Sequence, residues 1–128
     1  MMVISSQKAQ EKIAILKSQK KNKEAIKMAA IHIDHNNFHS EVLGSEQKVL
    51  LDFWAPWCGP CRMVSPVIDQ IAQERPDVKV AKINVEEAPD LATLYRVYSI
   101  PTLMVMEKGR VVTQSVGAKP KAAILGML

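Results

Sequence analysis

The chain is poor in the residue types that mark several common protein classes. It has two cysteines in 128 residues, Cys58 and Cys61, which excludes a framework of several disulfide bonds. It has no glycine-rich nucleotide-binding loop, and no apolar run approaches the roughly 18 residues of a membrane-spanning helix. The opening residues 1–12 lack the apolar core of a secretory signal. What remains is a single pair of cysteines, which we expect to work in a reducing compartment.

Positive charge is concentrated at the amino-terminal end. Residues 1–29 hold seven Lys and two Glu, a net charge of +5, whereas the other ten basic and eleven acidic residues give −1. We therefore expect an extension at 1–29 and one domain at 30–128. The composition of the extension predicts a solvated segment, helical or disordered, that is dispensable for chemistry. The alternatives are a basic arm for an acidic partner, nucleic acid or an anionic membrane surface, or a transit peptide, which the absence of Arg disfavours.

Residues 49–66, with the sequence VLLDFWAPWCGPCRMVSP, contain both cysteines and both tryptophans. The apolar run that opens this stretch predicts a strand buried on both faces, and the apolar residues after Cys61 recur at helical spacing. Cys58 should therefore lie at a helix N-terminus, where unpaired N–H groups and the helix dipole favour a thiolate. Cys61 follows about one turn later. This spacing predicts Cys58 as the attacking thiolate and Cys61 as the resolving thiol of disulfide exchange.

The rest of the hydrophobic pattern predicts alternating strands and helices. Besides the central strand we expect strands at 30–33, 78–85, 103–106 and 111–116, and helices that end at Gly44, that follow Cys61, and that span 88–95 and 119–127. The side chains of Asp34, Asn36 and Asn37 offer N-caps for the first helix. A helical crossover predicts parallel strands. The fold class is α/β with a mixed sheet, in the order β-α-β-α-β-α-β-β-α.

A metal site is the other chemistry that the sequence offers. His32, His35 and His39 lie close together, and imidazole is a common zinc ligand. Their spacing spans a strand end, a turn and a helix start, with no cysteine nearby. A zinc site at the cysteines needs two further ligands at suitable spacing. We therefore expect no metal, and interpret the histidines as surface residues.

Taken together, the strings WCGPC at 57–61, DFWA at 52–55, IPT at 100–102 and VGA at 116–118 resemble the thioredoxin family. The similarity covers roughly residues 30–128. It implies the thioredoxin fold and a thiol–disulfide oxidoreductase that reduces protein disulfides and maintains redox homeostasis in the cytoplasm. It also implies a monomer with no bound cofactor. After each target disulfide is reduced, an NADPH-dependent thioredoxin reductase would return the protein to its dithiol form.

The resemblance also assigns roles close to the cysteines. Gly59 and Pro60 between them are similar to reducing members of the family, whereas oxidants and isomerases usually carry His before the second cysteine. Asp52 matches a buried aspartate that assists deprotonation of the resolving cysteine, and Lys82 matches a lysine near it. Burial should raise the pKa of such a carboxyl group. The residues alone leave open that Asp52 is solvated or simply paired.

Further from the cysteines, Pro101 matches a cis-proline that leaves the backbone of Ile100 free to pair with an extended substrate segment. An ordinary trans proline is the alternative from the residues alone. Trp57 should line an apolar surface around the nucleophile, and Gly117 should allow close backbone approach there. Phe53 is expected in the core.

Two departures and two alternatives accompany the resemblance. Arg96 stands where many relatives have Gly, and Met106 where an aromatic residue is common. An oxidase or isomerase on the same fold is one alternative function. A binding module with an incidental redox pair, whose basic arm holds a partner, is the other.

Overall fold

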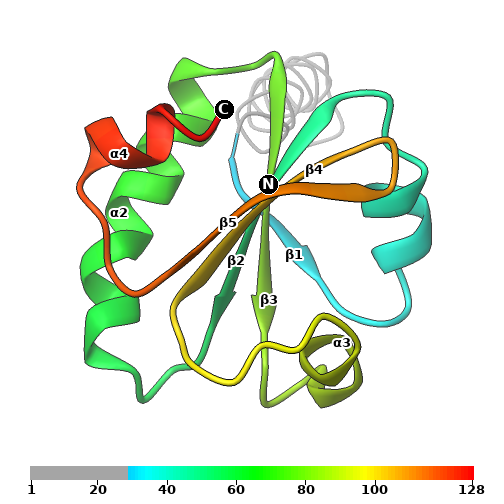
Figure 1. Ribbon diagram of the computed structural model, residues 1–128, viewed down its shortest axis with the longest axis horizontal. Helices are drawn as coiled ribbons and strands as arrows, with labels where there is room; N and C mark the ends of the chain where they lie inside the picture. Colours follow the sequence, from blue (N-terminus) through cyan, green and yellow to red (C-terminus); the bar gives the residue numbers. More distant parts are fainter. Residues whose placement is uncertain (1–28) are drawn as a thin grey trace, which may run out of the picture.

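The computed structural model describes residues 29–128, so the predictions for residues 1–28 lie outside the described residues. Five strands form one mixed sheet in the order β1-β3-β2-β4-β5 (Figure 1). They are β1 (Ile31–Ile33), β2 (Lys48–Trp54), β3 (Val78–Asn84), β4 (Thr102–Glu107) and β5 (Arg110–Val116). β1, β3 and β2 run parallel, and β4 is antiparallel to both β2 and β5. The predicted mixed sheet is confirmed.

Helices cover both faces of this sheet. They are η1 (His39–Leu43), α2 (Gly59–Glu74), α3 (Pro89–Leu94) and α4 (Lys121–Leu125). Figure 1 shows α2 and α4 on one face, while η1 and α3 lie on the other. The order of elements agrees with the prediction. Among the described helices, none is both long and apolar enough to cross a membrane.

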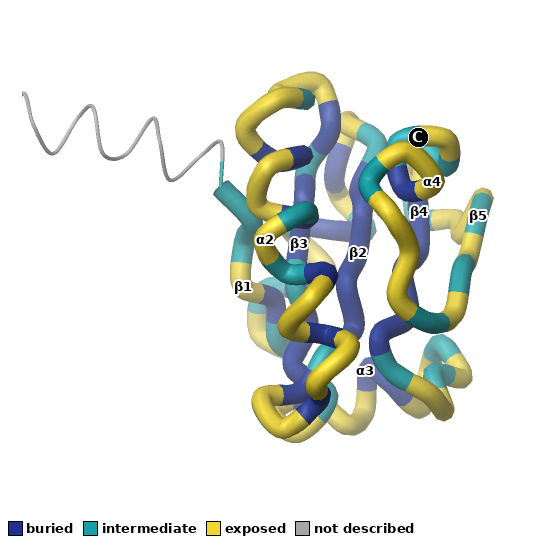
Figure 2. Tube along the Cα trace, turned by 90° about the vertical axis from the view of Figure 1, so that its left-hand side faces the viewer, coloured by how far each residue is buried: buried dark blue, intermediate teal, exposed yellow. Residues whose placement is uncertain are grey.

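The strand β2 is buried along its length because side chains pack on both of its faces. Leu50 belongs to the core cluster under α2 and α4, whereas Leu51 and Phe53 belong to the cluster under η1 and α3. Alternate residues of a strand point to opposite faces, so a doubly covered strand is a continuous apolar run. Figure 2 shows this buried central layer between more exposed segments. The prediction of Phe53 as a core residue is confirmed.

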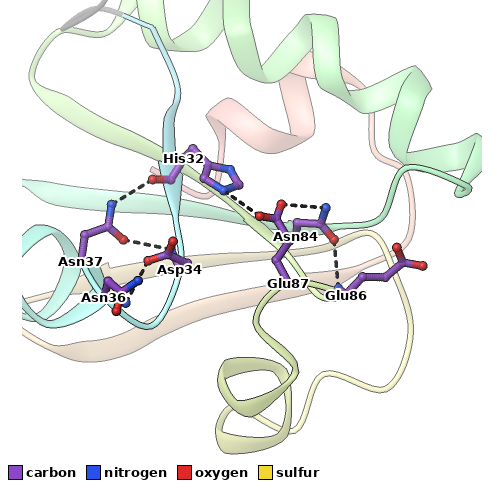
Figure 3. A network of polar contacts seen from close by, with 7 residues as sticks. All are labelled: His32, Asp34, Asn36, Asn37, Asn84, Glu86 and Glu87. Carbon is purple, nitrogen blue, oxygen red and sulfur yellow. Dashed lines mark hydrogen bonds and ion pairs between the residues drawn. The ribbon is translucent and has the colours of Figure 1, made fainter.

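The first helix differs from the prediction. η1 is a five-residue π-helix whose N-cap is Phe38, and no side chain caps it. Instead, the Asn37 side chain accepts a hydrogen bond from the Asp34 N–H, and the Asp34 carboxylate accepts one from the Asn36 N–H (Figure 3). Short polar side chains satisfy nearby backbone groups in turns as readily as at helix ends. Here they stabilise the turn after β1.

The bounds of other elements also differ from the prediction: α4 is shorter than expected, whereas β4 and β5 each begin one residue earlier. α4 begins at Lys121 because Pro120 occupies its N-cap, and it ends at Leu125. Gly109 has φ +78 in the turn between β4 and β5, a backbone conformation that glycine adopts without steric cost. Arg96 has φ 56. A left-handed backbone explains why glycine is favoured at the position of Arg96.

Candidate functional site

Segments that are far apart in the sequence meet at one end of the sheet. Trp57 follows β2 and donates its indole N–H to Glu86, which follows β3. The Gly117 N–H, after β5, donates to the Pro101 carbonyl, before β4, at 2.8 Å. The two cysteines join this group at the start of α2. The carboxyl ends of neighbouring parallel strands are a common place for reactive sites in α/β folds.

Cys58 is the N-cap of α2, as the sequence predicts. Its sulfur accepts a hydrogen bond from the Cys61 N–H at 3.2 Å. The two cysteines form a disulfide, with their Cα atoms 5.2 Å apart. Pro60 occupies the first turn, where a missing N–H removes no helical hydrogen bond. When the disulfide is reduced, the same N–H group and the helix dipole stabilise a thiolate at Cys58.

A second loop lies against the disulfide. The Ile100–Pro101 peptide bond is cis, which agrees with the resemblance and excludes the ordinary trans proline. This loop brings the Ile100 carbonyl oxygen to 3.8 Å from the Cys58 sulfur. Gly117 has φ +95, and an added Cβ would meet no atom within 4 Å, so open space lies beside the backbone there. The backbone of the Ile100–Pro101 loop therefore forms part of the surroundings of Cys58.

Asp52 lies in the middle of β2 on the face that α2 covers. It is 1% exposed, and its Oδ1 atom has no hydrogen-bond partner among the described residues. Desolvation raises the pKa of Asp52 from 3.8 to about 7, although the positive charge of Lys82 acts in the opposite direction. The alternative of a solvated Asp52 is therefore wrong. A carboxyl group with this pKa can take up and release a proton near neutral pH.

Lys82 is the strand neighbour of Asp52, but its ammonium group makes its contacts elsewhere. The two residues are opposite each other in the β2–β3 register. The Lys82 Nζ atom donates to the Ser65 hydroxyl oxygen at 2.6 Å and lies 3.1 Å from the Asp69 Oδ1 atom. Among the described residues, no ion pair joins Lys82 to Asp52. Ser65 and Asp69 are thus part of the surroundings of the buried carboxyl group.

Trp57 is held by a polar network that Figure 3 shows in part. The Trp57 side chain is 62% exposed, yet its indole N–H is bonded to the Glu86 carboxylate. The Asn84 side chain accepts from the Glu86 N–H at 2.9 Å and donates to Glu87 at 3.1 Å. His32 lies 3.5 Å from the Glu87 carboxylate. The exposed side chain of Trp57, next to Cys58 in the sequence, is thereby tied to the end of β3.

The histidines do not form a cluster of metal ligands. In residues 29–128, no group of three or more His, Cys, Asp or Glu side chains is arranged to hold a metal ion. His35 and His39 are exposed.

Comparison with known proteins agrees with this geometry. The thioredoxin family model matches residues 29–128. Thioredoxin 1 of Synechococcus elongatus is 54% identical over 92 residues, which is 71% of this chain and 86% of that protein. Thioredoxin 1 of Nostoc sp. is 50% identical over 97 residues, or 75% of this chain and 91% of that protein. The chain belongs to the thioredoxin family.

A solved structure supports the same assignment. A single-site mutant of thioredoxin from Halobacterium salinarum has a TM-score of 0.73 and 33% sequence identity, and the match covers 78% of this chain and 88% of that one. The family, together with the Cys58–Cys61 pair, makes this protein a thiol–disulfide oxidoreductase that reduces disulfides by dithiol–disulfide exchange.

The sequence prediction missed three polar residues at this site. Glu86 bonds to Trp57 across 29 positions of the chain, and no local pattern signals such a contact. Ser65 and Asp69 are different, because Cys61, Ser65 and Asp69 recur at every fourth position of one helix. Residues at this spacing share a helix face, so the pattern was available in the sequence.

Burial of Asp52 has a consequence for stability. Below pH 3.8 the carboxyl group is protonated in both the folded and the unfolded chain. Between pH 3.8 and about 7 the unfolded chain ionises first, so the free energy of unfolding falls as the pH rises. We expect Asp52→Asn to raise that free energy at pH 8 by up to about 4 kcal/mol, from a shift of roughly three units. Denaturant unfolding of the disulfide form at pH 4 and pH 8 measures it.

The control for this measurement is the exposed Asp90. Asp90→Asn should change the free energy of unfolding by less than about 1 kcal/mol at both pH values. The benefit of Asp52→Asn should disappear at pH 4. A benefit of equal size at both pH values would contradict the raised pKa of Asp52.

Proposed function

We propose that Cys58 is the nucleophile of a protein-disulfide reductase and that Cys61 is its resolving thiol. The observation that carries this assignment is the N-cap position of the Cys58 sulfur, which accepts the Cys61 N–H. These features favour the thiolate at Cys58. Cys61 is 2% exposed and lies inside the first turn. Both cysteines are buried, so the difference between them is position: Cys61 lies one turn further into the helix, which suits it to react with a sulfur atom already attached to Cys58.

The proposed cycle transfers two electrons to the target. The Cys58 thiolate attacks one sulfur of the target disulfide, which forms a mixed disulfide and releases the other target sulfur as a thiolate. Cys61 loses its proton to Asp52 and attacks the Cys58 sulfur. The second target sulfur leaves as a thiolate, and Cys58 and Cys61 become the disulfide. Desolvation raises the pKa of Asp52 to about 7, which supports its role as proton acceptor, and the positive charge of Lys82 acts on that pKa in the opposite direction.

Target recognition is assigned to the backbone of the cis-proline loop. In the part of the chain that the structure describes, the N–H and C=O groups of Ile100 make no backbone hydrogen bond. An extended target segment can therefore pair with Ile100 while its disulfide faces Cys58. Trp57 and Gly117 border this position, and Pro101 sets its direction. Gly59 and Pro60 complete the loop of a reducing member of the family.

The remaining proposals concern the surroundings of the protein. The oxidised pair needs a two-electron donor, and an NADPH-dependent thioredoxin reductase is the partner that the family implies. The other partners are target proteins that contain disulfides. We place the protein in the cytoplasm as a monomer, where a reducing pool suits a catalytic pair. Residues 1–29 are a separate extension from the catalytic domain at 30–128, one that is dispensable for chemistry and has a charge suited to an acidic partner.

Serine variants of the two cysteines distinguish their proposed roles, because only one variant should accumulate a mixed disulfide. Cys61→Ser keeps the nucleophile but removes the resolving thiol, so it should accumulate a mixed disulfide with a target protein. Cys58→Ser should form no such adduct and should lose essentially all reductase activity. Non-reducing electrophoresis and intact mass of the adduct measure this. Accumulation of the adduct with Cys58→Ser instead would reverse the assignment.

The midpoint potential separates a reductase from an oxidase or isomerase. With Gly59 and Pro60 between the cysteines we expect a value near about −270 mV, where thioredoxin lies. Equilibration of the Cys58–Cys61 pair against a dithiol redox buffer measures it. A value of about −180 to −120 mV is typical of isomerases and strong oxidants and would argue against a cytoplasmic reductant.

Deletion of residues 1–28 tests the division of the chain. The shortened protein should keep most of its disulfide-reducing activity, because the residues assigned to the site all lie between 52 and 117. Initial rates with a protein disulfide substrate measure this. Loss of most of the activity would show that the extension takes part in catalysis or in target binding.

A further inference from the structure

One face of α2 carries three residues of different chemistry in a row. Cys61, Ser65 and Asp69 are spaced by four residues, so their side chains lie one above the other along the helix. Beneath this helix face, Asp52 and Lys82 are register neighbours on the parallel strands β2 and β3. Side chains of paired residues in adjacent strands project from the same face of a sheet. An unrestrained Lys82 ammonium group would thus find the Asp52 carboxyl group beside it.

The ammonium group is held elsewhere. Its Nζ atom donates to the Ser65 hydroxyl oxygen at 2.6 Å and pairs with the Asp69 Oδ1 atom at 3.1 Å. The Lys82 side chain is 18% exposed, which is little enough for these contacts to hold it. The Asp52 Oδ1 atom, by contrast, has no hydrogen-bond partner in residues 29–128. Ser65 and Asp69 of α2 therefore bind the Lys82 ammonium group, so this group does not donate a hydrogen bond to the Asp52 Oδ1 atom.

We propose that Ser65 and Asp69 are positioning residues that hold the ammonium group of Lys82 on the α2 side, away from the carboxyl group of Asp52. The inference rests on the proposed role of Asp52 as proton acceptor for Cys61. A carboxyl group in a close ion pair remains ionised at neutral pH and binds a proton weakly. By keeping Lys82 occupied, Ser65 and Asp69 leave Asp52 able to accept the proton of the resolving thiol.

The charged groups around Asp52 act in known directions. Lys82, from β3, lowers the pKa of Asp52, and Asp69, from α2, raises it. On the other side, the neighbour of Asp52 in β4 is the uncharged Leu103. Cys61, from α2, is a free thiol in the dithiol form and in the mixed disulfide, whereas the disulfide form has no such thiol and isolates Asp52 from it. Loss of either Ser65 or Asp69 as a partner of Lys82 should lower the pKa of Asp52.

The first experiment follows the Asp52 carboxyl carbon by NMR as the full chain, in its disulfide form, is titrated. We expect Asp69→Asn to lower the titration midpoint of Asp52 by roughly one unit, the lower end of what an adjacent opposite charge produces. Ser65→Ala, which removes no charge, should lower it by a smaller amount. In a Lys82→Met background, Ser65→Ala should have no effect, because its action passes through the ammonium group.

Glu74→Gln is the matched control. Glu74 is another acidic residue of α2, and it pairs with a lysine of a different element, Lys121, at 2.6 Å. Its loss changes the charge of the helix as Asp69→Asn does, and it should leave the midpoint of Asp52 unchanged. An unmoved midpoint in Ser65→Ala would overturn the proposal, whatever Asp69→Asn does, because Asp69→Asn also removes a charge that raises the pKa of Asp52 directly. An effect of Ser65→Ala that persists in the Lys82→Met background would do the same.

The second experiment separates this proposal from the catalytic role of Asp52. The rate at which the mixed disulfide is resolved is measured between pH 5 and 9 by stopped flow. We expect the midpoint of its pH profile to move to lower pH in Ser65→Ala and Asp69→Asn by the shift that NMR records, and Asp52→Asn to abolish that midpoint. If NMR records the shifts but the profile does not follow, the positioning of Lys82 stands and the proton-transfer role of Asp52 fails.

Discussion

The burial of one carboxyl group in the central strand is the constraint on which the rest of the site depends. Asp52 interrupts the apolar part of β2, from Val49 to Trp54, and desolvation is the largest influence on its pKa. Such a position is unfavourable for an ion and is tolerated because two large clusters of apolar side chains stabilise the sheet on both faces. The same apolar surroundings raise the pKa of this carboxyl group towards neutral pH, where thiols exchange with disulfides.

The electrostatic surroundings of the two cysteines differ, although the residues are only three positions apart. Cys58 lies at the N-cap, where the helix dipole and the Cys61 N–H stabilise negative charge. Cys61 lies deeper, on the helix face that continues to Ser65 and Asp69. In the proposed cycle the helix dipole acts on Cys58, and the buried carboxyl group of Asp52 acts on Cys61. This asymmetry supports the proposal that two chemically identical side chains take different steps of the exchange reaction.

Much of this was predictable from the sequence, for identifiable reasons. The strand, loop and helix around Cys58 follow from local periodicity, and the mixed sheet follows from the order of elements. The cis bond before Pro101 came only from the resemblance, because no local rule requires it. The contact of Glu86 with Trp57 depends on how β2 and β3 end together in space. The turn at Asp34 was assigned to the helix because capping side chains and turn side chains are the same residue types.

The charged residues around Lys82 extend from the core, at Asp52, to the solvent, at Asp69. The buried and the exposed charge respond differently to salt. The Asp69 side chain is 53% exposed, whereas Asp52 is 1% exposed. Mobile ions screen an exposed charge within about 8 Å at physiological ionic strength, but act much less on a buried one. Added salt therefore weakens the ion pair between Lys82 and the exposed Asp69 before it affects the hydrogen bond between Lys82 and Ser65. Proton affinity at the site can thus be adjusted from the surface of α2, without any change to the sulfur atoms or to the buried carboxyl group.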